Sequence, residues 1–262
     1  MSTPRPTPVS IDMSGKVALV TGGGYGMGRA SARRFAECGA SVVVADINPV
    51  TGAATVDLIR AAGGEATYIE VDVGESEGVR DMVAATVATY GGLDYAHNNA
   101  GIVEAQEPVT RFPEELWDRI IRTNLTGTFL CLKHEIPAML ERGGGAVVNV
   151  ASETTYKGNA GDVAYTASKH GVVGLTQVTG LRYAKRGIRV NAIAPGNIET
   201  GIVERAREYM NPEQVRYMET VMPIGRLGQP EEIAELVVWL CSDAASMINA
   251  TRVAVDSGWH VA

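Results

Sequence analysis

Short runs of apolar, mostly β-branched residues alternate along the chain with longer amphipathic stretches. The short runs predict strands at 17–21, 41–46, 66–71, 93–98, 146–151, 189–194 and 252–256. Most of them are apolar at successive positions, which is typical of strands buried on both faces. The longer stretches predict helices at 26–38, 49–62, 76–90, 116–141, 162–186 and 230–242. This alternation predicts an α/β fold, a doubly wound parallel sheet of about seven strands with helices on both faces.

No internal repeat, low-complexity segment or long linker divides the chain, so we expect one domain over residues 13–262. Residues 1–12 are polar and contain three prolines, and they are expected to form a flexible arm. The stretch 197–229 interrupts the alternation and is expected to form a lid over a bound substrate. Its predicted apolar lining is Tyr209, Met210, Tyr217, Met218 and Met222. The alternative is an ordinary pair of surface helices.

Composition excludes several classes of protein. Of the 262 residues 45% are hydrophobic, enough for a buried core, which excludes a disordered chain. A net charge of −7 without a basic block excludes nucleic acid as an expected partner. The chain has no apolar run of about 20 residues that would span a membrane. Its three cysteines have no disulfide-framework or metal-site spacing, which favours a cytoplasmic location. No metal site is predicted, because the histidines also lack metal-binding spacing; they are His97, His134, His170 and His260.

A glycine-rich loop, T-G-G-G-Y-G-M-G over residues 21–28, follows the first predicted strand and precedes a helix. Glycines in this context let the backbone N–H groups of a helix N-terminus approach a dinucleotide pyrophosphate, so the fold is expected to be of Rossmann type. Asp46 ends the second strand 18 residues beyond Gly28, close to the spacing of a carboxylate that binds the adenosine ribose. This carboxylate favours NAD and repels the 2′-phosphate of NADP. Arg29 is the one nearby cation that could reach that phosphate.

Tyr165 and Lys169 are four residues apart in a predicted helix and project from one face of it. Ser152 ends the fifth strand, Asn124 lies in the preceding helix, and an N-N-A-G turn follows the fourth strand at 98–101. Each of these positions lies at or near the carboxyl edge of the predicted sheet. Taken together with the glycine loop, with Pro195-Gly196 and with Thr200, they resemble the motifs of the short-chain dehydrogenase/reductase (SDR) family. The resemblance extends from about residue 15 to the end of the chain.

The resemblance implies a catalytic role for each of four residues. Tyr165 would be the general acid/base that exchanges a proton with the substrate oxygen. Lys169 would lower the pKa of that phenol and hold the nicotinamide ribose, because a free phenol with a pKa near 10 is a poor base at neutral pH. Ser152 would steady the developing alkoxide or carbonyl, and Asn124 would position a water for proton relay.

The resemblance also implies the cofactor-binding residues. These are Gly22, Tyr25, Gly26, Met27, Gly28, Asp46, Ile47, Asp72, Val73, Asn99, Ala100, Gly101, Tyr165, Lys169, Pro195, Gly196, Ile198 and Thr200. Two positions depart from the family pattern. Met27 replaces a more common isoleucine of similar volume. Glu153 follows the serine where small or polar residues are usual, and it either faces the pocket, favouring a polyol or amine-bearing substrate, or points away.

These observations favour an NAD-dependent oxidoreductase that interconverts a small-molecule secondary alcohol and its ketone. One alternative is an NADPH-dependent reductase of 3-oxoacyl thioesters, against which Asp46 argues. A non-catalytic dinucleotide-binding protein is the other, and the loss of a catalytic residue would mark it. The family likeness also implies a homotetramer. The sequence leaves the substrate open among sugars or polyols, steroids, cyclic alcohols and short hydroxy acids.

Overall fold

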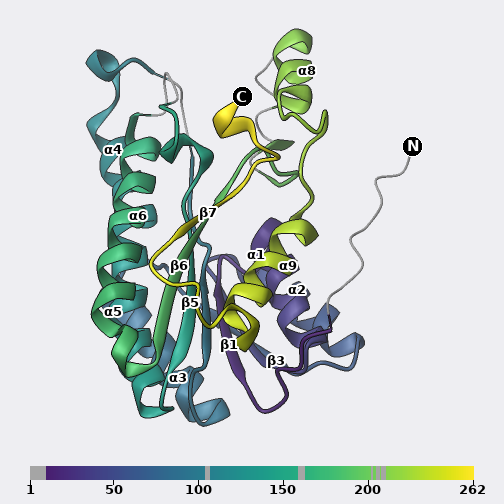
Figure 1. The fold of residues 1–262 in the computed structure, drawn as a ribbon, viewed down its shortest axis with the longest axis vertical. Coiled ribbons are helices and arrows are strands. Elements are labelled where there is room, and N and C mark those ends of the chain that lie inside the picture. Colours follow the sequence, from purple (N-terminus) through teal and green to yellow (C-terminus); the bar gives the residue numbers. More distant parts are fainter. Residues whose placement is uncertain (1–9, 104–106, 159–162, 202, 205–206, 208–210) are drawn as a thin grey trace.

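A computed structural model describes residues 10–103, 107–158, 163–201, 203–204, 207 and 211–262 of the chain. Seven parallel strands form one sheet in the order β3-β2-β1-β4-β5-β6-β7 (Figure 1). The predicted doubly wound parallel sheet is thus confirmed. The strands are β1 (Val17–Thr21), β2 (Ser41–Asp46), β3 (Ala66–Glu70), β4 (Tyr95–Asn98), β5 (Gly145–Val150), β6 (Ile188–Pro195) and β7 (Arg252–Val255).

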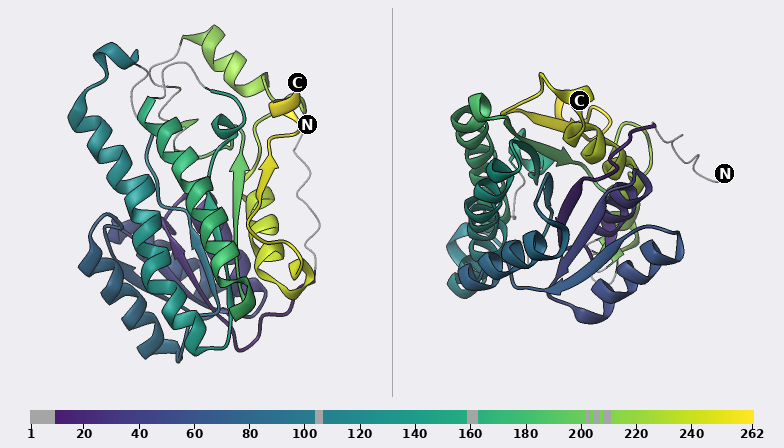
Figure 2. Two further views of the ribbon diagram at one scale, coloured as in Figure 1. Left: turned by 60° about the vertical axis from the view of Figure 1, so that its left-hand side comes forward. Right: turned by 90° about the horizontal axis from the view of Figure 1, so that it is seen from below.

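Helices cover both faces of the sheet (Figure 2). One layer holds α1 (Gly26–Glu37), α2 (Pro49–Ala61) and α9 (Pro230–Cys241), and the other holds α3 (Ser76–Tyr90), α5 (Gly127–Glu141) and α6 (Val163–Tyr183). Successive strand residues enter different cores: Val20 packs with Phe35 on one side, and Leu19 packs with Val43 on the other. This explains why the central strands have continuous apolar runs, since nearly every side chain there is buried whichever face it joins, whereas the edge strands β3 and β7 are partly exposed.

The predicted helix at 116–141 is helical throughout in the structure, over residues 114–141, but it contains a π-helical turn that the sequence did not predict. The structure has α4 (Glu114–Ile120), then a π-helical turn (Ile121–Thr126), then α5. The wider turn places Asn124 in the interior, where its side chain bonds both backbone groups of Ile102. Such an insertion is invisible to apolar periodicity, because it shifts the phase of the helix without ending it. The other boundaries agree with prediction to within two residues where the structure describes them, except that α6 ends at Tyr183, three residues early, and a 3₁₀ turn continues to Arg186.

The predicted lid contains α8 (Pro212–Thr220), whose N-terminus is capped by Asn211 and Gln214. Met222 is buried and packs closely on Gly196. Tyr217 is 67% exposed, so it does not belong to a buried lining as predicted. Tyr209 and Met210 lie outside the described residues, as do residues 1–9 of the predicted arm.

A buried polar cluster crosses the core between β4, β5 and α5. Asn98 Nδ2 donates to Glu135 Oε2 at 3.1 Å and to Asn149 Oδ1 at 3.0 Å. Glu135 Oε1 and Asn98 Oδ1 are both buried without a hydrogen-bond partner in the described part of the chain. Burial raises the pKa of Glu135 to about 7, because the ionised carboxylate is costly in the interior. The neutral acid therefore fits this cluster best.

The raised pKa of Glu135 makes stability depend on pH. In the folded state Glu135 stays protonated up to about pH 7, whereas in the unfolded chain a glutamate has a pKa near 4.3 and loses its proton there. The free energy of unfolding should therefore fall between about pH 4 and 7 and stay lower above that range. We expect Glu135→Gln to match the wild type at pH 4 and to exceed it by about 1–3 kcal/mol at pH 8 in urea unfolding. The exposed Glu141→Gln is the control; equal pH profiles for the wild type and Glu135→Gln would contradict the prediction.

Candidate active site

The glycine loop connects β1 to α1 at the carboxyl edge of the sheet. Gly22 and Gly26 have φ values of +60° and +52°, in the left-handed region that favours glycine. A Cβ on Gly28 would lie 2.1 Å from the Gly22 carbonyl oxygen, so any side chain there would clash with the loop backbone. The loop geometry thus requires these glycines and leaves its backbone free of side chains at the start of α1.

The turn after β4 is tied to this loop. Asn99 Nδ2 donates to the carbonyl oxygens of Thr21 and Gly22 at 3.0 and 3.1 Å. In return, Thr21 Oγ1 accepts from the backbone N–H groups of Asn99 and Ala100. These bonds hold the ends of two adjacent strands in fixed register at the edge where ligands bind in open α/β sheets.

A cleft of about 450 Å³ opens over these strand ends. Predicted cofactor residues that line it are Gly22, Tyr25, Gly26, Met27, Asp46, Ile47, Asp72, Val73, Asn99, Ala100, Gly101 and Thr200. Lining residues that the sequence did not single out are Val71, Ile102, Arg119, Arg122, Thr123 and Gly201. Four further predicted residues lie elsewhere at the same edge: Gly28 beneath the loop, Pro195 at the end of β6, and Gly196 and Ile198 directly after it.

Asp46 ends β2 at the wall of the cleft. Its Oδ2 accepts from the Gly24 N–H at 2.8 Å, and its Oδ1 accepts from the Asn48 N–H at 2.9 Å. Arg29 points elsewhere, since its guanidinium bonds the Gly24 carbonyl and Thr55 Oγ1. Within the described residues, Arg29 is absent from the cleft lining. The carboxylate of Asp46, rather than the guanidinium of Arg29, therefore faces the cleft.

Tyr25 joins the glycine loop to the lid. Its hydroxyl donates to the Glu204 carboxylate, at 2.9 and 3.0 Å from the two oxygens. This hydrogen bond raises the pKa of Tyr25, because the neutral phenol is the form that can donate. Gly201 lies against the Tyr25 ring, and Gly26 lies against Thr200. The first described residues of the lid thus rest on the loop at one end of the cleft.

Lys169 is buried on α6, with its ammonium among the predicted catalytic residues. Its Nζ donates to the Val150 carbonyl oxygen at 2.7 Å and lies 5.5 Å from the centre of the Tyr165 ring. A Cβ on Gly101 would lie 3.5 Å from Lys169 Nζ and 3.3 Å from Asn124 Oδ1, so both polar groups flank that glycine. Burial lowers the pKa of Lys169 to about 8, which still leaves the ammonium form predominant at neutral pH.

Ser152 follows β5 and caps a short 3₁₀ helix, Glu153–Thr155. Its Oγ accepts from the Thr154 N–H at 3.2 Å and donates to Glu153 Oε2 at 2.8 Å. Of the two orientations open for Glu153, the structure places its carboxylate against the Ser152 hydroxyl. The sequence signals that Glu153 is unusual at this position, but its direction depends on the 3₁₀ turn.

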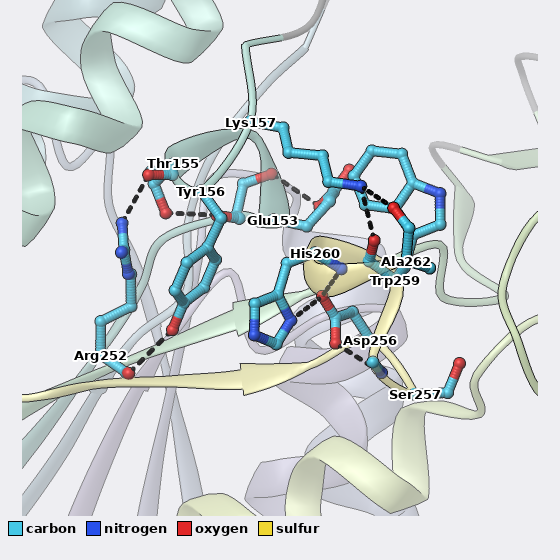
Figure 3. A network of polar contacts seen from close by, with 12 residues as sticks. Glu153, Thr155, Tyr156, Lys157, Arg252, Asp256, Ser257, Trp259, His260 and Ala262 are labelled. Atoms are coloured by element: carbon cyan, nitrogen blue, oxygen red, sulfur yellow. Dashed lines mark hydrogen bonds and ion pairs between the residues drawn. The ribbon is translucent and has the colours of Figure 1, made fainter.

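Arg252 on β7 contacts the end of this turn and the residue that follows it. Tyr156 Oη donates to the Arg252 carbonyl oxygen at 3.0 Å, and the Arg252 guanidinium lies 3.5 Å from the centre of the Tyr156 ring (Figure 3). Arg252 Nη1 also donates to the Thr155 carbonyl oxygen at 2.6 Å. A single arginine thus contacts two consecutive residues of the segment that begins at Ser152.

The C-terminal segment adds a second set of contacts (Figure 3). Lys157 Nζ donates to the Trp259 carbonyl oxygen at 2.8 Å and lies 4.7 Å from the centre of that ring system. His260 Nδ1 is 2.8 Å from Asp256 Oδ2, and the imidazole lies beside the Tyr156 ring at 4.4 Å. The turn that holds Ser152 is therefore supported from the last residues of the chain.

The described side chains and helices bear on metal and membrane binding. No three His, Cys, Asp or Glu side chains there gather in a way that could hold a metal ion. His97 is fully buried, and burial lowers its pKa to about 3, so it is a neutral core residue. None of the described helices combines the length and the apolar character needed to cross a bilayer.

Comparison with known proteins identifies the family. The family profile described as Enoyl-(Acyl carrier protein) reductase matches residues 22–260. A 2,5-dichloro-2,5-cyclohexadiene-1,4-diol dehydrogenase of Sphingobium indicum is 44% identical over 252 residues, which cover 95% of this chain and 98% of that protein. The crystal structure of levodione reductase has a TM-score of 0.91 at 39% identity, covering 95% of this chain and 99% of that one. The chain belongs to the SDR family.

Another relative of this SDR is a cyclohexanol dehydrogenase of Acinetobacter sp., 41% identical over 251 residues, covering 96% of this chain and 97% of the relative. The chain is an SDR oxidoreductase, an enzyme class that uses a nicotinamide dinucleotide. Its residues fit that cofactor: side-chain-free glycines lead into α1, and the cleft runs on to the carboxylate of Asp46. The glycine loop would hold the pyrophosphate, and Lys169 would hold the nicotinamide ribose.

The contacts of Arg252 with Thr155 and Tyr156, next to Ser152, can be tested. Arg252→Ala removes the bond to the Thr155 carbonyl and the contact with Tyr156, so we expect a loss of about 1–3 kcal/mol in the free energy of unfolding. We also expect a larger fall in kcat than in NADH affinity, since Ser152 lies on the same segment. Urea unfolding, steady-state kinetics and NADH fluorescence measure these quantities. Arg182→Ala, at an exposed position of α6, is the control; if the two variants behave alike, the brace has no role.

Proposed function

We propose that this SDR oxidises alicyclic secondary alcohols to ketones with NAD, using Tyr165 as the general base. The observation that carries the proposal is the buried Lys169 ammonium, which lies over the Tyr165 ring and bonds the Val150 carbonyl two residues before Ser152. A positive charge at this place favours the phenolate over the phenol. Two relatives named above act, by their names, on ring alcohols, a cyclohexadiene diol and cyclohexanol.

In the proposed reaction the cofactor handles the hydride and the side chains handle the proton and the developing charge. Once bound, the oxidised nicotinamide would supply the acceptor for the hydride of the alcohol carbon. The Tyr165 phenolate takes the hydroxyl proton, so that a C=O bond replaces the C–H and O–H bonds and one proton leaves to solvent. The Ser152 hydroxyl, which donates to Glu153 in the structure, would turn its proton to the reacting oxygen as negative charge develops there. Asn124 holds the Ile102 backbone and positions the water that returns Tyr165 to the phenolate.

Asp46 supports NAD over NADP. A carboxylate accepts hydrogen bonds from the two free ribose hydroxyls of NAD, whereas the 2′-phosphate of NADP would place a second negative charge beside it. Arg29 is held by Gly24 and Thr55 and does not offset that repulsion.

Assembly and location stay predictions. Phe129 on α5 and Leu181 on α6 are 47% and 74% exposed, which supports contacts between these helices in a homotetramer. A cytoplasmic location fits the absence of a disulfide among the described cysteines, which are all free and buried.

Replacing Tyr165 tests the proton transfer. Tyr165→Phe should lower kcat for cyclohexanol by about 10²–10⁴-fold, the usual contribution of a general acid/base, while NADH still binds. Cyclohexanol oxidation is followed by NADH absorbance, and NADH binding by fluorescence. An acetoacetyl thioester with NADPH is assayed in parallel, since the family profile carries the name of an acyl carrier protein reductase. A variant as active as the wild type would falsify the role of Tyr165, and faster turnover of the thioester would reject the alcohol substrate.

Replacing Asp46 tests the cofactor choice. Asp46→Ala should raise the KM for NAD and lower the ratio of kcat/KM for NAD over NADP by at least about tenfold, because it removes both the ribose acceptor and the repelling charge. Asp46→Asn removes the charge but keeps an acceptor for the Gly24 N–H, so it should relax discrimination with less effect on NAD. The exposed Asp57→Ala in α2 is the charge-matched control. An unchanged cofactor ratio in both Asp46 variants would exclude Asp46 from this role.

A further inference from the structure

Arg122 lies at the wall of the cleft, in the π-helical turn that the sequence did not predict. Its Nη2 donates to Asp72 Oδ2 at 2.7 Å and also to Glu75 Oε1. Asp72 follows β3, and Glu75 directly precedes α3. The arginine therefore joins the π-helical turn to the loop between β3 and α3, and it places a positive charge between two carboxylates.

The Asp72 carboxylate is held at both of its oxygens. Oδ1 accepts from the Gly74 N–H at 2.9 Å, and Oδ2 accepts from Arg122. A Cβ on Gly74 would lie 2.9 Å from Cγ, Nε and Cζ of Arg122, so the arginine lies along this glycine. A carboxylate offers about four acceptor positions, and these two bonds use one on each oxygen. Since the Asp72 side chain is 30% exposed and lines the cleft, it can still accept from a ligand there.

The place of Asp72 in the cleft points to the base of the dinucleotide. Asp46 and Glu70 are register partners at the ends of β2 and β3, and the Val71 N–H donates to the Asp46 carbonyl oxygen at 3.2 Å. Asp46 is proposed to bind the adenosine ribose, so the next residues along this edge would meet the adenine joined to that ribose. Val71 and Val73 line the cleft on either side of Asp72 in the chain. Two apolar side chains and a carboxylate suit a flat base with a polar edge.

An ionised carboxylate distinguishes between purines, because it only accepts hydrogen bonds. Adenine has an amino group at position 6, which would donate a charge-assisted hydrogen bond to Asp72. A 6-oxopurine such as hypoxanthine has a carbonyl oxygen there, and two acceptors would repel each other. Without Arg122, Asp72 and Glu75 would leave two uncompensated negative charges beside an anionic cofactor. The Asp72 side chain would also lose one of the two bonds that fix its direction.

We propose that Arg122 is a positioning residue that holds the Asp72 carboxylate toward the adenine amino group, so that the enzyme selects adenine dinucleotides over 6-oxopurine dinucleotides. The inference rests on the proposed function, since it assumes that NAD binds with its ribose at Asp46. It gives a role to a cleft residue that no motif of the sequence marked.

The test compares the Kd of NADH with the Kd of reduced nicotinamide hypoxanthine dinucleotide, which carries a carbonyl oxygen in place of the amino group. Nicotinamide fluorescence measures both without turnover. The wild type should bind NADH at least about tenfold more tightly. Arg122→Met should lower this preference by at least about threefold. Arg122→Lys keeps the charge without the planar fork and should recover part of the preference.

A change in Asp72 tests the same contact from the other side. Asp72→Asn offers both a donor and an acceptor, so it should bring the ratio of the two Kd values close to about one. This variant and Arg122→Lys keep the test valid if Arg122→Met does not fold. A wild type without preference for NADH, or an unchanged preference in Asp72→Asn, would overturn the inference.

Controls separate positioning of Asp72 from a structural effect. Glu75→Gln removes the other partner of Arg122, outside the described lining of the cleft, and should keep the preference for NADH. Arg80→Met removes an exposed arginine of α3 that pairs with Asp81 and should also keep it. If Arg122 merely supported the fold, both dinucleotides would lose affinity by the same factor, and that unchanged ratio would overturn the inference alone. Failure of the wild type to bind NADH would overturn it together with the proposed function.

Discussion

The site is arranged around one buried ammonium group. Lys169 is buried, and removing its ammonium group from water costs desolvation free energy. The hydrogen bond from Nζ to the Val150 carbonyl oxygen offsets part of that cost. The same bond fixes α6 against the end of β5, the strand that leads into Ser152. Since Tyr165 lies one helical turn before Lys169, its ring is set beside the charge by helix geometry. The position of the Tyr165 ring and the positive charge beside it therefore both depend on the hydrogen bond between Lys169 and Val150.

The turn after β4 links the glycine loop to the surroundings of Lys169 and Asn124. Asn99 bonds the glycine loop on one side, and Gly101 lies between Lys169 and Asn124 on the other. Asn124 in turn holds Ile102 with both atoms of its amide. A displacement of this turn would disturb the cleft wall and the lysine environment together. The geometry thus links the glycine loop and the cleft wall to the surroundings of Lys169.

Several features of the site were beyond sequence reasoning. The π-helical turn between α4 and α5 could not be foreseen, because the sequence predicts helix on both sides of it and the turn does not end the helix. It is this turn that places Arg122 and Thr123 at the cleft and buries Asn124. The exposure of Tyr217 in the lid was also missed, since an aromatic residue in a short surface helix is buried only if another element lies over it.

The sequence by itself predicted the sheet, the glycine loop and the acidic end of β2, because these features depend on local periodicity and on backbone conformations that glycine tolerates. The four catalytic candidates came from the resemblance of their motifs to the SDR family. Tertiary structure alone decided that Glu153 meets the Ser152 hydroxyl, that Arg29 is held away from the cleft, and that the last residues of the chain brace the serine turn. Those outcomes depend on contacts between residues distant in sequence or on the exact rotation of a short turn, and neither is encoded in local pattern.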